Sequence, residues 1–352
     1  MTTLYLTIPG STLHRSGETL RLYIPPQETE PARKVNVPLA QVSQVIVVGN
    51  VTLTTQVLAT LLEHQVSITY LSSHGRFLGQ LGPSLGPNGV LRIAQHLAHH
   101  DPRKRMAIAQ ACVVGKLHNQ RVLLQRYQRR QPHPKLAEAV SVLRRCEKEA
   151  ETLSLTDEPP PDRRRPQAQS IWGSLFGLEG TGGAAYFRAF ARLLPDEWSF
   201  SGRRRRPPTD PVNALLSFAY TLLHHQVLTA VKIVGFDPYV GFLHGSKYNK
   251  PALALDLMEE FRAIIADSVV LTLINKRILT LDDFEETLGA YRLNDKGKRR
   301  FFRQWERRLE THLRHPIFGY DTTYRRALVL QVRLLARHIL GELKSYPPLL
   351  VR

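Results

Sequence analysis

The spacing of apolar residues in this 352-residue chain changes once, at a segment rich in glycine and proline, and this change restricts the possible folds. Before residue 82 the apolar residues mostly alternate with polar ones, as in Leu4, Leu6 and Ile8, which is the period of a half-buried strand. After residue 90 they recur three and four residues apart, which is the period of an amphipathic helix. The sequence therefore predicts an α+β fold.

The same pattern predicts how the chain divides. Further strands are expected over residues 20–24, 45–48 and 66–70, and one short helix over residues 58–62. The run 45–48 is apolar throughout, so it suits a central strand, and the long helices are expected over residues 107–130 and 136–153. The predicted organisation is a small N-terminal β domain over residues 1–81, a linker over 82–90 and a larger all-helical domain over 91–352.

The charge of the chain is strongly positive and unevenly distributed. It carries 48 Lys+Arg against 30 Asp+Glu, a formal net charge of +18. Residues 1–90 hold five basic and four acidic side chains, so the remaining residues carry +17. A phosphate backbone is the partner that matches such a field most simply, and the alternative is that the charge only keeps the protein soluble.

The cysteines and the apolar stretches of the sequence indicate the cellular compartment. Only Cys112 and Cys146 are present, which is too few for a disulfide framework and lacks the spacing of a zinc site. No apolar stretch approaches the roughly 20 residues of a membrane span, and the first ten residues do not resemble a signal peptide. We therefore expect a protein that acts in the cytoplasm.

A polar stripe is predicted on one long helix. Its members are spaced for one face of a helix that is otherwise apolar: Asn213, Ser217, Tyr220 and His224. Because the stripe contains no Lys, Arg or Glu, it favours a lined cleft over a face that only meets solvent, and we expect its four residues to contact DNA.

Three carboxylates and one imidazole are candidates for a catalytic or metal-binding role. Glu179 lies in an uncharged, glycine-rich neighbourhood that favours a close helix contact, and His244 ends an apolar run after Gly235. Asp256 and Glu259 are three residues apart, so they share one helical face, where Arg262 would offset them if the face were simply solvated. Two carboxylates and one imidazole, from Glu179, Glu259 and His244, suit Mg²⁺ or Mn²⁺.

Basic and aromatic residues alternate near position 300. The predicted DNA-contacting cations are Lys298, Arg299, Arg300 and Arg303. They are interleaved with Phe301, Phe302 and Trp305, which suit either stacking on an unpaired strand or burial in a core. The arginine runs 163–165 and 203–206 are expected to lie in loops, where they either contact the DNA backbone or have no specific role.

Five motifs follow one another along the second part of the chain: Glu179-Gly180 with Tyr186-Phe187, Asp210 to Asn213, Leu216-Ser217 with Tyr220, Gly235 to His244, and Asp256 to Arg262. In this order and spacing they resemble the CRISPR-associated spacer-acquisition integrase/endonuclease family. The resemblance covers nearly the whole chain and extends to Lys116 and Asn119 on the first long helix. Gly182 and Gly183 stand where the family commonly has alanines, and the 203–206 loop lengthens the separation between Glu179 and His244.

The resemblance implies a fold, a metal site and partners. It implies a β-sandwich-like N-terminal domain, a helical catalytic domain and a homodimer. It also implies that Glu179, His244 and Glu259 are the catalytic metal ligands, with Asp256 as a supporting carboxylate. The implied partners are double-stranded and branched DNA and a small CRISPR-associated protein.

The implied reaction is phosphoryl transfer. A 3′-hydroxyl of a short duplex attacks the repeat array and inserts a new spacer, while water in its place gives endonuclease activity. Two alternatives remain open from the sequence: an integrase of a mobile element, and a DNA-binding scaffold without catalysis.

Overall fold

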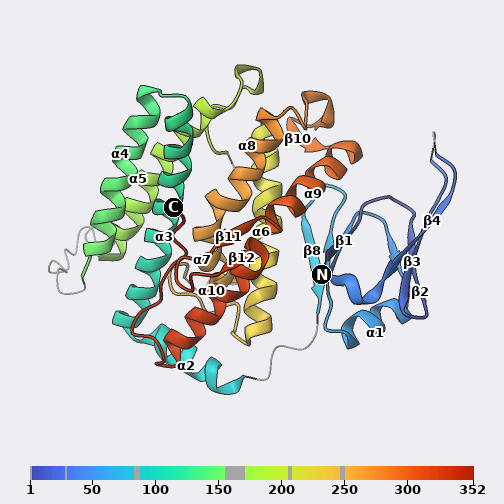
Figure 1. Cartoon of the computed structure of the whole chain (residues 1–352), viewed down its shortest axis with the longest axis horizontal. Helices are drawn as coiled ribbons and strands as arrows, with labels where there is room; N and C mark the ends of the chain where they lie inside the picture. Colours follow the sequence, from blue (N-terminus) through green and yellow to red (C-terminus); the bar gives the residue numbers. More distant parts are fainter. Residues whose placement is uncertain (1, 28–29, 83–87, 155–170, 205–207, 246–249) are drawn as a thin grey trace. The chain divides into compact units, whose positions relative to one another are not determined.

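The computed structural model describes every residue except 1, 28–29, 83–87, 155–170, 205–207 and 246–249 (Figure 1). The chain forms two compact units, Met1–Leu85 with Leu279–Glu306, and Gly86–Ile278 with Arg307–Arg352. The first division falls inside the segment 82–90. The second division differs from the prediction, because residues 279–306 belong with the N-terminal residues.

The first unit contains two four-stranded sheets that share one apolar core. One sheet has the order β1-β5-β7-β8, from β1 (Thr2–Leu6), β5 (Val42–Val48), β7 (Ser67–Leu71) and β8 (Phe77–Leu81). The other has the order β4-β3-β2-β6, from β4 (Arg33–Pro38), β3 (Thr19–Ile24), β2 (Thr12–Ser16) and β6 (Thr52–Leu53). Leu13 and Leu20 of the second sheet and Val45 of the first lie in the same buried cluster, so the two sheets pack face to face.

These elements confirm the predicted α+β class and most of the predicted strands. The apolar run 45–48 lies in β5, which pairs in parallel with both β1 and β7. A central parallel strand is covered on both faces, and this explains why its apolar residues do not alternate with polar ones. The predicted short helix is α1 (Thr55–Glu63), which contributes Val57 and Leu61 to the same core.

The prediction of an all-helical region after residue 91 needs correction. The hairpin β9 (Phe284–Thr287) and β10 (Ala290–Leu293) and the hairpin β11 (His312–Arg314) and β12 (Asp321–Thr323) lie within it. These strands have only three or four residues, which is too short for a period of two to be visible in the sequence. After β10 comes α9 (Asp295–Leu309), whose Phe301, Phe302 and Trp305 are buried. The aromatic residues there are core residues, and the stacking alternative is wrong.

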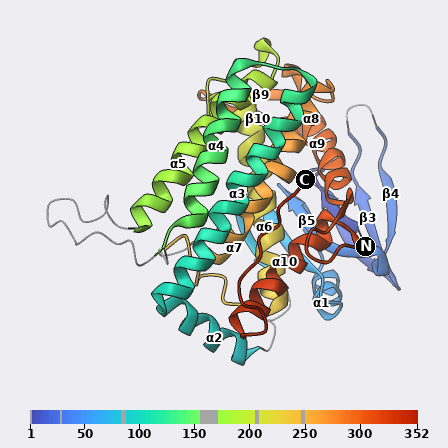
Figure 2. The ribbon, with the colours of Figure 1, turned by 60° about the vertical axis from the view of Figure 1, so that its left-hand side comes forward.

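The second unit is mainly helical (Figure 2). Its helices are α2 (Gly89–His100), α3 (Pro102–Arg130), α4 (Pro134–Thr152), α5 (Ile171–Phe190), α6 (Pro211–Val234), α7 (Ala252–Phe261), α8 (Ser268–Asn275) and α10 (Tyr324–Ile339). A π-helical turn over Arg262–Asp267 joins α7 to α8. Both figures show α3, α4 and α5 side by side.

Local chemistry explains where the long helices start and how closely they pack. Asp101 and Asp210 accept hydrogen bonds from backbone amides in the first turns of α3 and α6, and a proline follows each. Gly182 of α5 lies against Leu117 of α3, where an added Cβ would overlap the leucine side chain. This confirms the predicted close helix contact. One helix, α6, has the length and hydropathy of a membrane span, but two thirds of that window (67%) is buried inside the protein.

Candidate active site

A buried carboxylate holds the loop that carries His244. Asp256 of α7 is fully buried and accepts hydrogen bonds from the backbone amides of Phe242 (2.5 Å), Leu243 (3.0 Å) and His244 (2.8 Å). Its Oδ1 also lies 2.7 Å from Nδ1 of His244. Gly241 is required in this loop, because a Cβ there would come within 2.7 Å of the Asp256 carboxylate. Asp256 thus fixes both the loop and the imidazole ring.

The hydrogen bond to Asp256 also determines which nitrogen of His244 can bind a ligand. Burial lowers the pKa of His244, but the Asp256 hydrogen bond and the charges of Asp256 and Glu259 outweigh it and raise the pKa. With Nδ1 engaged by a carboxylate, Nε2 is the ring nitrogen suited to coordination, which is the usual arrangement around metal-binding histidines.

Glu259 is a buried carboxylate that two cations keep ionised. Its side chain is 4% exposed, and Oε2 lies 2.8 Å from Nζ of Lys116 and 3.0 Å from Nε of Arg262. Burial raises the pKa of Glu259, but Arg262 and Lys116 outweigh it and lower the pKa to about 2. The alternative of a solvated acidic face is therefore wrong, although Arg262 does offset the charge.

Glu179 reaches the same cluster from another helix. It lies in the middle of α5, and its Oε1 forms an ion pair with Lys116 of α3. Lys116 therefore bridges Glu179 and Glu259, while the His244 charge is close enough to Glu259 to lower its pKa. The fold thus brings Glu179 of α5 and Glu259 of α7 to the same lysine, and it brings His244 of the 235–244 loop close enough to Glu259 for its charge to act there.

The donor chemistry of these side chains fits a hard divalent cation, although the carboxylates surround an ammonium group in this structure. In the described part of the chain, no three His, Cys, Asp or Glu side chains converge into a cluster that could hold a metal ion. The three predicted ligands therefore do not form a metal cluster in this structure. Lys116 supplies the positive charge between the part-buried Glu179 and the buried Glu259, and this charge offsets the repulsion between the two carboxylates. Two ionisable carboxylates and an imidazole with its Nδ1 engaged remain the ligand types that Mg²⁺ and Mn²⁺ use.

A glutamine that the sequence did not indicate holds the other end of the histidine loop. Gln95 of α2 is fully buried, and its Nε2 donates to the carbonyl oxygens of Asp237 (2.8 Å) and Val240 (2.7 Å). Its Oε1 accepts from the amide of Asp237 at 2.9 Å. These bonds join residues more than 140 positions apart, so no local pattern could have revealed them.

We expect Gln95→Met to weaken both the fold and the site. The substitution leaves buried backbone groups without partners, which costs about 2–4 kcal/mol of unfolding free energy. Because the loop then holds His244 less firmly, the Kd for Mn²⁺ is expected to rise about tenfold or more. Isothermal titration of Mn²⁺ and denaturant unfolding measure the two effects.

Gln110→Met is the matched control. Gln110 also donates to backbone carbonyl oxygens, those of Ala150, Glu151 and Leu153, but it touches no part of the histidine loop. We expect it to lower stability and leave Mn²⁺ affinity unchanged. An equal loss of Mn²⁺ affinity in both variants would show that Gln95 acts only through stability.

A second missed network lies beside Glu259. The neighbouring Glu260 is buried and accepts hydrogen bonds from Tyr346 Oη (2.6 Å) and the amide of Leu349 (2.5 Å). Asn119 of α3 donates to the carbonyl oxygens of Glu260 and Leu349, both at 2.7 Å, and accepts from the amide of Val351 at 3.1 Å. Residues 346–351 are thus fastened to α3 and α7 next to the candidate ligand.

The polar stripe of α6 is contacted by arginines of the preceding loop, Arg203 and Arg204. Asn213 is fully buried and bonded to Asp210, Gly202, Arg203 and Arg204, so the prediction that it contacts DNA is wrong. Its hydrogen-bonding capacity is used in holding the preceding loop.

The other members of the stripe are only partly buried. Ser217 accepts a hydrogen bond from Arg203 at 3.0 Å. Tyr220 donates to the buried Asp267 at 2.6 Å and lies under the guanidinium groups of Arg203 and Arg262. Burial, followed by the charge of Arg262, lowers the pKa of His224 to about 4. Whether these three side chains contact DNA stays a prediction.

The basic residues of α9 are placed differently from one another. Arg299 and Arg303 are exposed, whereas Lys298 is paired with Asp295 (3.0 Å) and Arg300 with Asp283 (2.7 Å). Of the arginine loops, Arg203 is anchored over Tyr220. Residues 205 and 206 and the run 163–165 lie outside the described residues.

Comparisons with known proteins identify the family of this chain. The family model "CRISPR associated protein Cas1" matches residues 4–307. "CRISPR-associated endonuclease Cas1 3" of Thermus thermophilus is 41% identical and covers 90% of this chain and 88% of its own. "CRISPR-associated endonuclease Cas1 2" of Rhodospirillum rubrum is 35% identical and covers 99% and 98%.

Solved structures show the same fold. A CAS1 protein from Thermotoga maritima has a TM-score of 0.77 at 27% identity and covers 97% of both chains. The structure described as a casposase bound to integration product has a TM-score of 0.83 at 24% identity, covering 100% of this chain and 95% of that one. The family match spans most of the chain, and near full-length relatives exceed 30% identity. The chain therefore belongs to the Cas1 family of CRISPR-associated proteins.

Proposed function

We propose that this chain is a divalent-metal-dependent DNA endonuclease and integrase of CRISPR adaptation, which inserts short DNA fragments as spacers into the repeat array. The observation that carries the proposal is that Lys116 pairs with both Glu179 and Glu259, and that the charge of His244 acts on Glu259, although the three side chains come from separate segments. The Cas1 endonucleases of similar sequence support the activity. A solved Cas6-RT-Cas1–Cas2 complex, 26% identical over 99% of this chain, supports a small Cas partner.

In the proposed reaction the 3′-oxygen of the incoming strand forms a bond to a phosphorus of the target strand. The target's own 3′-oxygen leaves and takes up a proton, so one phosphodiester is exchanged for another. Replacing the attacking hydroxyl by water gives hydrolysis instead. Glu179, Glu259 and His244 would hold Mg²⁺ or Mn²⁺, which when bound neutralises charge on the scissile phosphate.

The remaining residues prepare this site. Asp256 keeps Nδ1 of His244 engaged, and Arg262 keeps Glu259 ionised at neutral pH. Lys116 balances the two carboxylates, and a divalent cation would compete with it for them. The net charge of +18 supplies sequence-independent attraction for duplex and branched DNA. We further propose that the chain works as a homodimer with the small partner, in the cytoplasm of a prokaryotic cell.

The experiment that tests the proposal is strand transfer of a short duplex into supercoiled DNA carrying a repeat. We expect the purified chain with its small partner to transfer strands in Mn²⁺, and His244→Ala to lose transfer and bound Mn²⁺ while DNA affinity stays unchanged. His338→Ala removes a histidine bonded to the Leu343 carbonyl oxygen and serves as control. Transfer by the unmutated chain without any divalent cation, or undiminished Mn²⁺ binding by His244→Ala, would contradict the assignment.

A further inference from the structure

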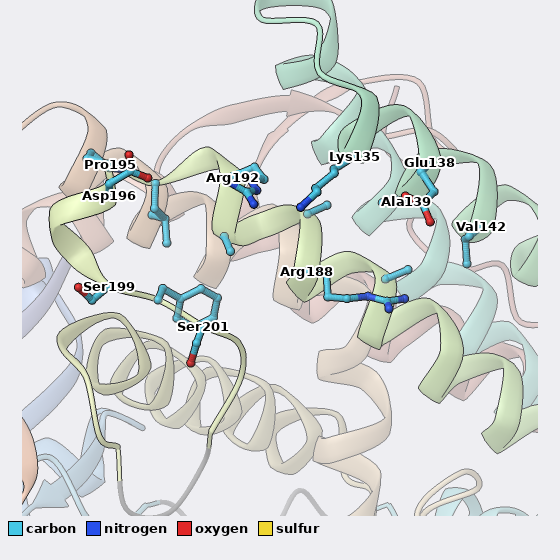
Figure 3. Close-up of a pocket in the computed structure, with 15 residues that line it drawn as sticks. Lys135, Glu138, Ala139, Val142, Arg188, Arg192, Pro195, Asp196, Ser199 and Ser201 are labelled. Carbon is cyan, nitrogen blue, oxygen red and sulfur yellow. The ribbon is translucent and has the colours of Figure 1, made fainter.

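A pocket separate from the candidate active site lies between α4, the end of α5 and the segment 191–201 (Figure 3). It encloses about 610 Å³, within the range of small-molecule binding sites. None of the metal-ligand candidates lines it.

Three cations line this pocket without ion-pair partners. They are Lys135 of α4, Arg188 of α5 and Arg192 just after α5. Figure 3 shows the Lys135 side chain extending from α4 toward Arg192. None of the three side chains forms a salt bridge or hydrogen bond within the part of the chain that the structure describes. Three like charges facing one cavity repel one another, so an anion would stabilise them.

Two carboxylates share the pocket with these cations and do not neutralise them. Glu138 and Asp196 line it but lie beyond ion-pair distance of the three cations. The hydroxyl groups of Ser199 and Ser201 are on the same side as Asp196 (Figure 3). A small inorganic anion would gain from the cations but be repelled by the carboxylates. The pocket therefore suits a ligand with an anionic end and a hydroxyl-bearing, uncharged end.

The rest of the lining is apolar. Val142 of α4, with Leu194 and Phe200 of the segment 191–201, forms a surface that Ala139, Ala185 and Ala189 extend. Phe200 and Leu194 are largely buried, so this surface is held in place by the surrounding core. It offers a flat ring an apolar face to contact.

We propose that this pocket binds one nucleotide unit. Its phosphate contacts Lys135, Arg188 and Arg192, a sugar hydroxyl donates to Glu138 or Asp196, and its base lies against Val142, Leu194 and Phe200. The unit is either a free mononucleotide or the 3′-terminal nucleotide of a single strand of DNA, since both carry a phosphate, a free 3′-hydroxyl and a base. The inference does not depend on the metal site, which shares no residue with the pocket.

The test is titration of the full chain with 2′-deoxyadenosine 5′-monophosphate, followed by isothermal calorimetry, in EDTA so that a metal site contributes nothing. We expect one saturable site per chain, and no saturable binding of 2′-deoxyadenosine, which lacks the phosphate. Arg188→Ala/Arg192→Ala is expected to raise the Kd about tenfold or more, since each charge-assisted hydrogen bond contributes substantially. Lys135→Ala, at an exposed position, gives the same direction of change with little risk to folding.

Arg144→Ala is the matched control, because Arg144 is an exposed cation on the same helix that does not line the pocket. Displacement of the mononucleotide by hexathymidylate assigns the pocket to a DNA strand, and no displacement assigns it to free nucleotide. Absence of saturable binding, equal binding of 2′-deoxyadenosine, or an equal loss in Arg144→Ala would overturn the proposal. Strand transfer in Mn²⁺ reports on the proposed function separately, so the two failures are distinguishable.

Discussion

Glu259→Gln is expected to abolish metal-dependent strand transfer and to destabilise the protein at the same time. Loss of a residue that merely orients a metal ligand costs about 10–100-fold in affinity or activity, so loss of a ligand should cost at least about 100-fold. The neutral amide also removes the negative charge that pairs with Lys116 and Arg262 inside the protein. Removing one partner of a buried ion pair lowers the unfolding free energy by about 3–5 kcal/mol.

Glu310→Gln is the matched control for the stability part. Glu310 is also paired with an arginine, Arg325 at 2.7 Å, but its side chain is half exposed (50%). Surface pairs contribute about 0–1 kcal/mol, so we expect little change in the denaturation midpoint and normal strand transfer. The assignment fails if Glu259→Gln transfers strands at a rate within a few-fold of the unmutated chain in Mn²⁺.

Asn119→Ala is expected to release residues 346–351 from α3 and α7. The substitution removes hydrogen bonds to the Glu260 and Leu349 carbonyl oxygens and the Val351 amide, all of them buried. Each buried backbone group left without a hydrogen-bond partner costs about 1–3 kcal/mol. We therefore expect the unfolding free energy to fall by about 3–5 kcal/mol in total. Urea unfolding measures the loss, and hydrogen exchange at residues 346–351 should rise as that segment opens more often.

Asn275→Ala provides the comparison for this network. Asn275 is exposed at the end of α8 and donates to the Leu193 carbonyl oxygen at 2.9 Å. Its loss should change stability by no more than about 1 kcal/mol. If Asn119→Ala leaves hydrogen exchange of residues 346–351 unchanged, the asparagine does not hold that segment.

Much of the fold follows from local patterns, and the exceptions are instructive. The alternation of apolar residues located the strands of the N-terminal region, and the unbroken run 45–48 correctly indicated a central strand. The two hairpins between residues 284 and 323 were missed, since strands of three or four residues carry no readable period. The aromatic residues of α9 alternate with basic residues, and this pattern is also found in segments that bind nucleic acids. Only their burial in the structure identified them as core residues.

The candidate ligands were recognisable from the sequence because of their chemical types and their motif order. Gln95 was not recognisable, and the resemblance singled out Lys116 and Asn119 without showing what they contact. The three side chains bond to residues 63 to more than 200 positions away. The same holds for Asn213, whose helical spacing was predicted correctly but whose side chain turned out to be buried under Arg203 and Arg204. Spacing places a side chain on a helical face, but the packing of other segments decides what that face meets.

The sequence by itself determined the α+β class and the family, and it supplied the acids and the histidine that we propose as metal ligands. These features depend on residue type and on spacing within one helix or strand, and both can be read from a short stretch of sequence. The tertiary structure alone decided the charge balance of the site, with Lys116 between Glu179 and Glu259 and Asp256 beneath His244. Electrostatic interactions of buried groups depend on distances of a few ångströms across the fold, and no pattern along the chain encodes those distances.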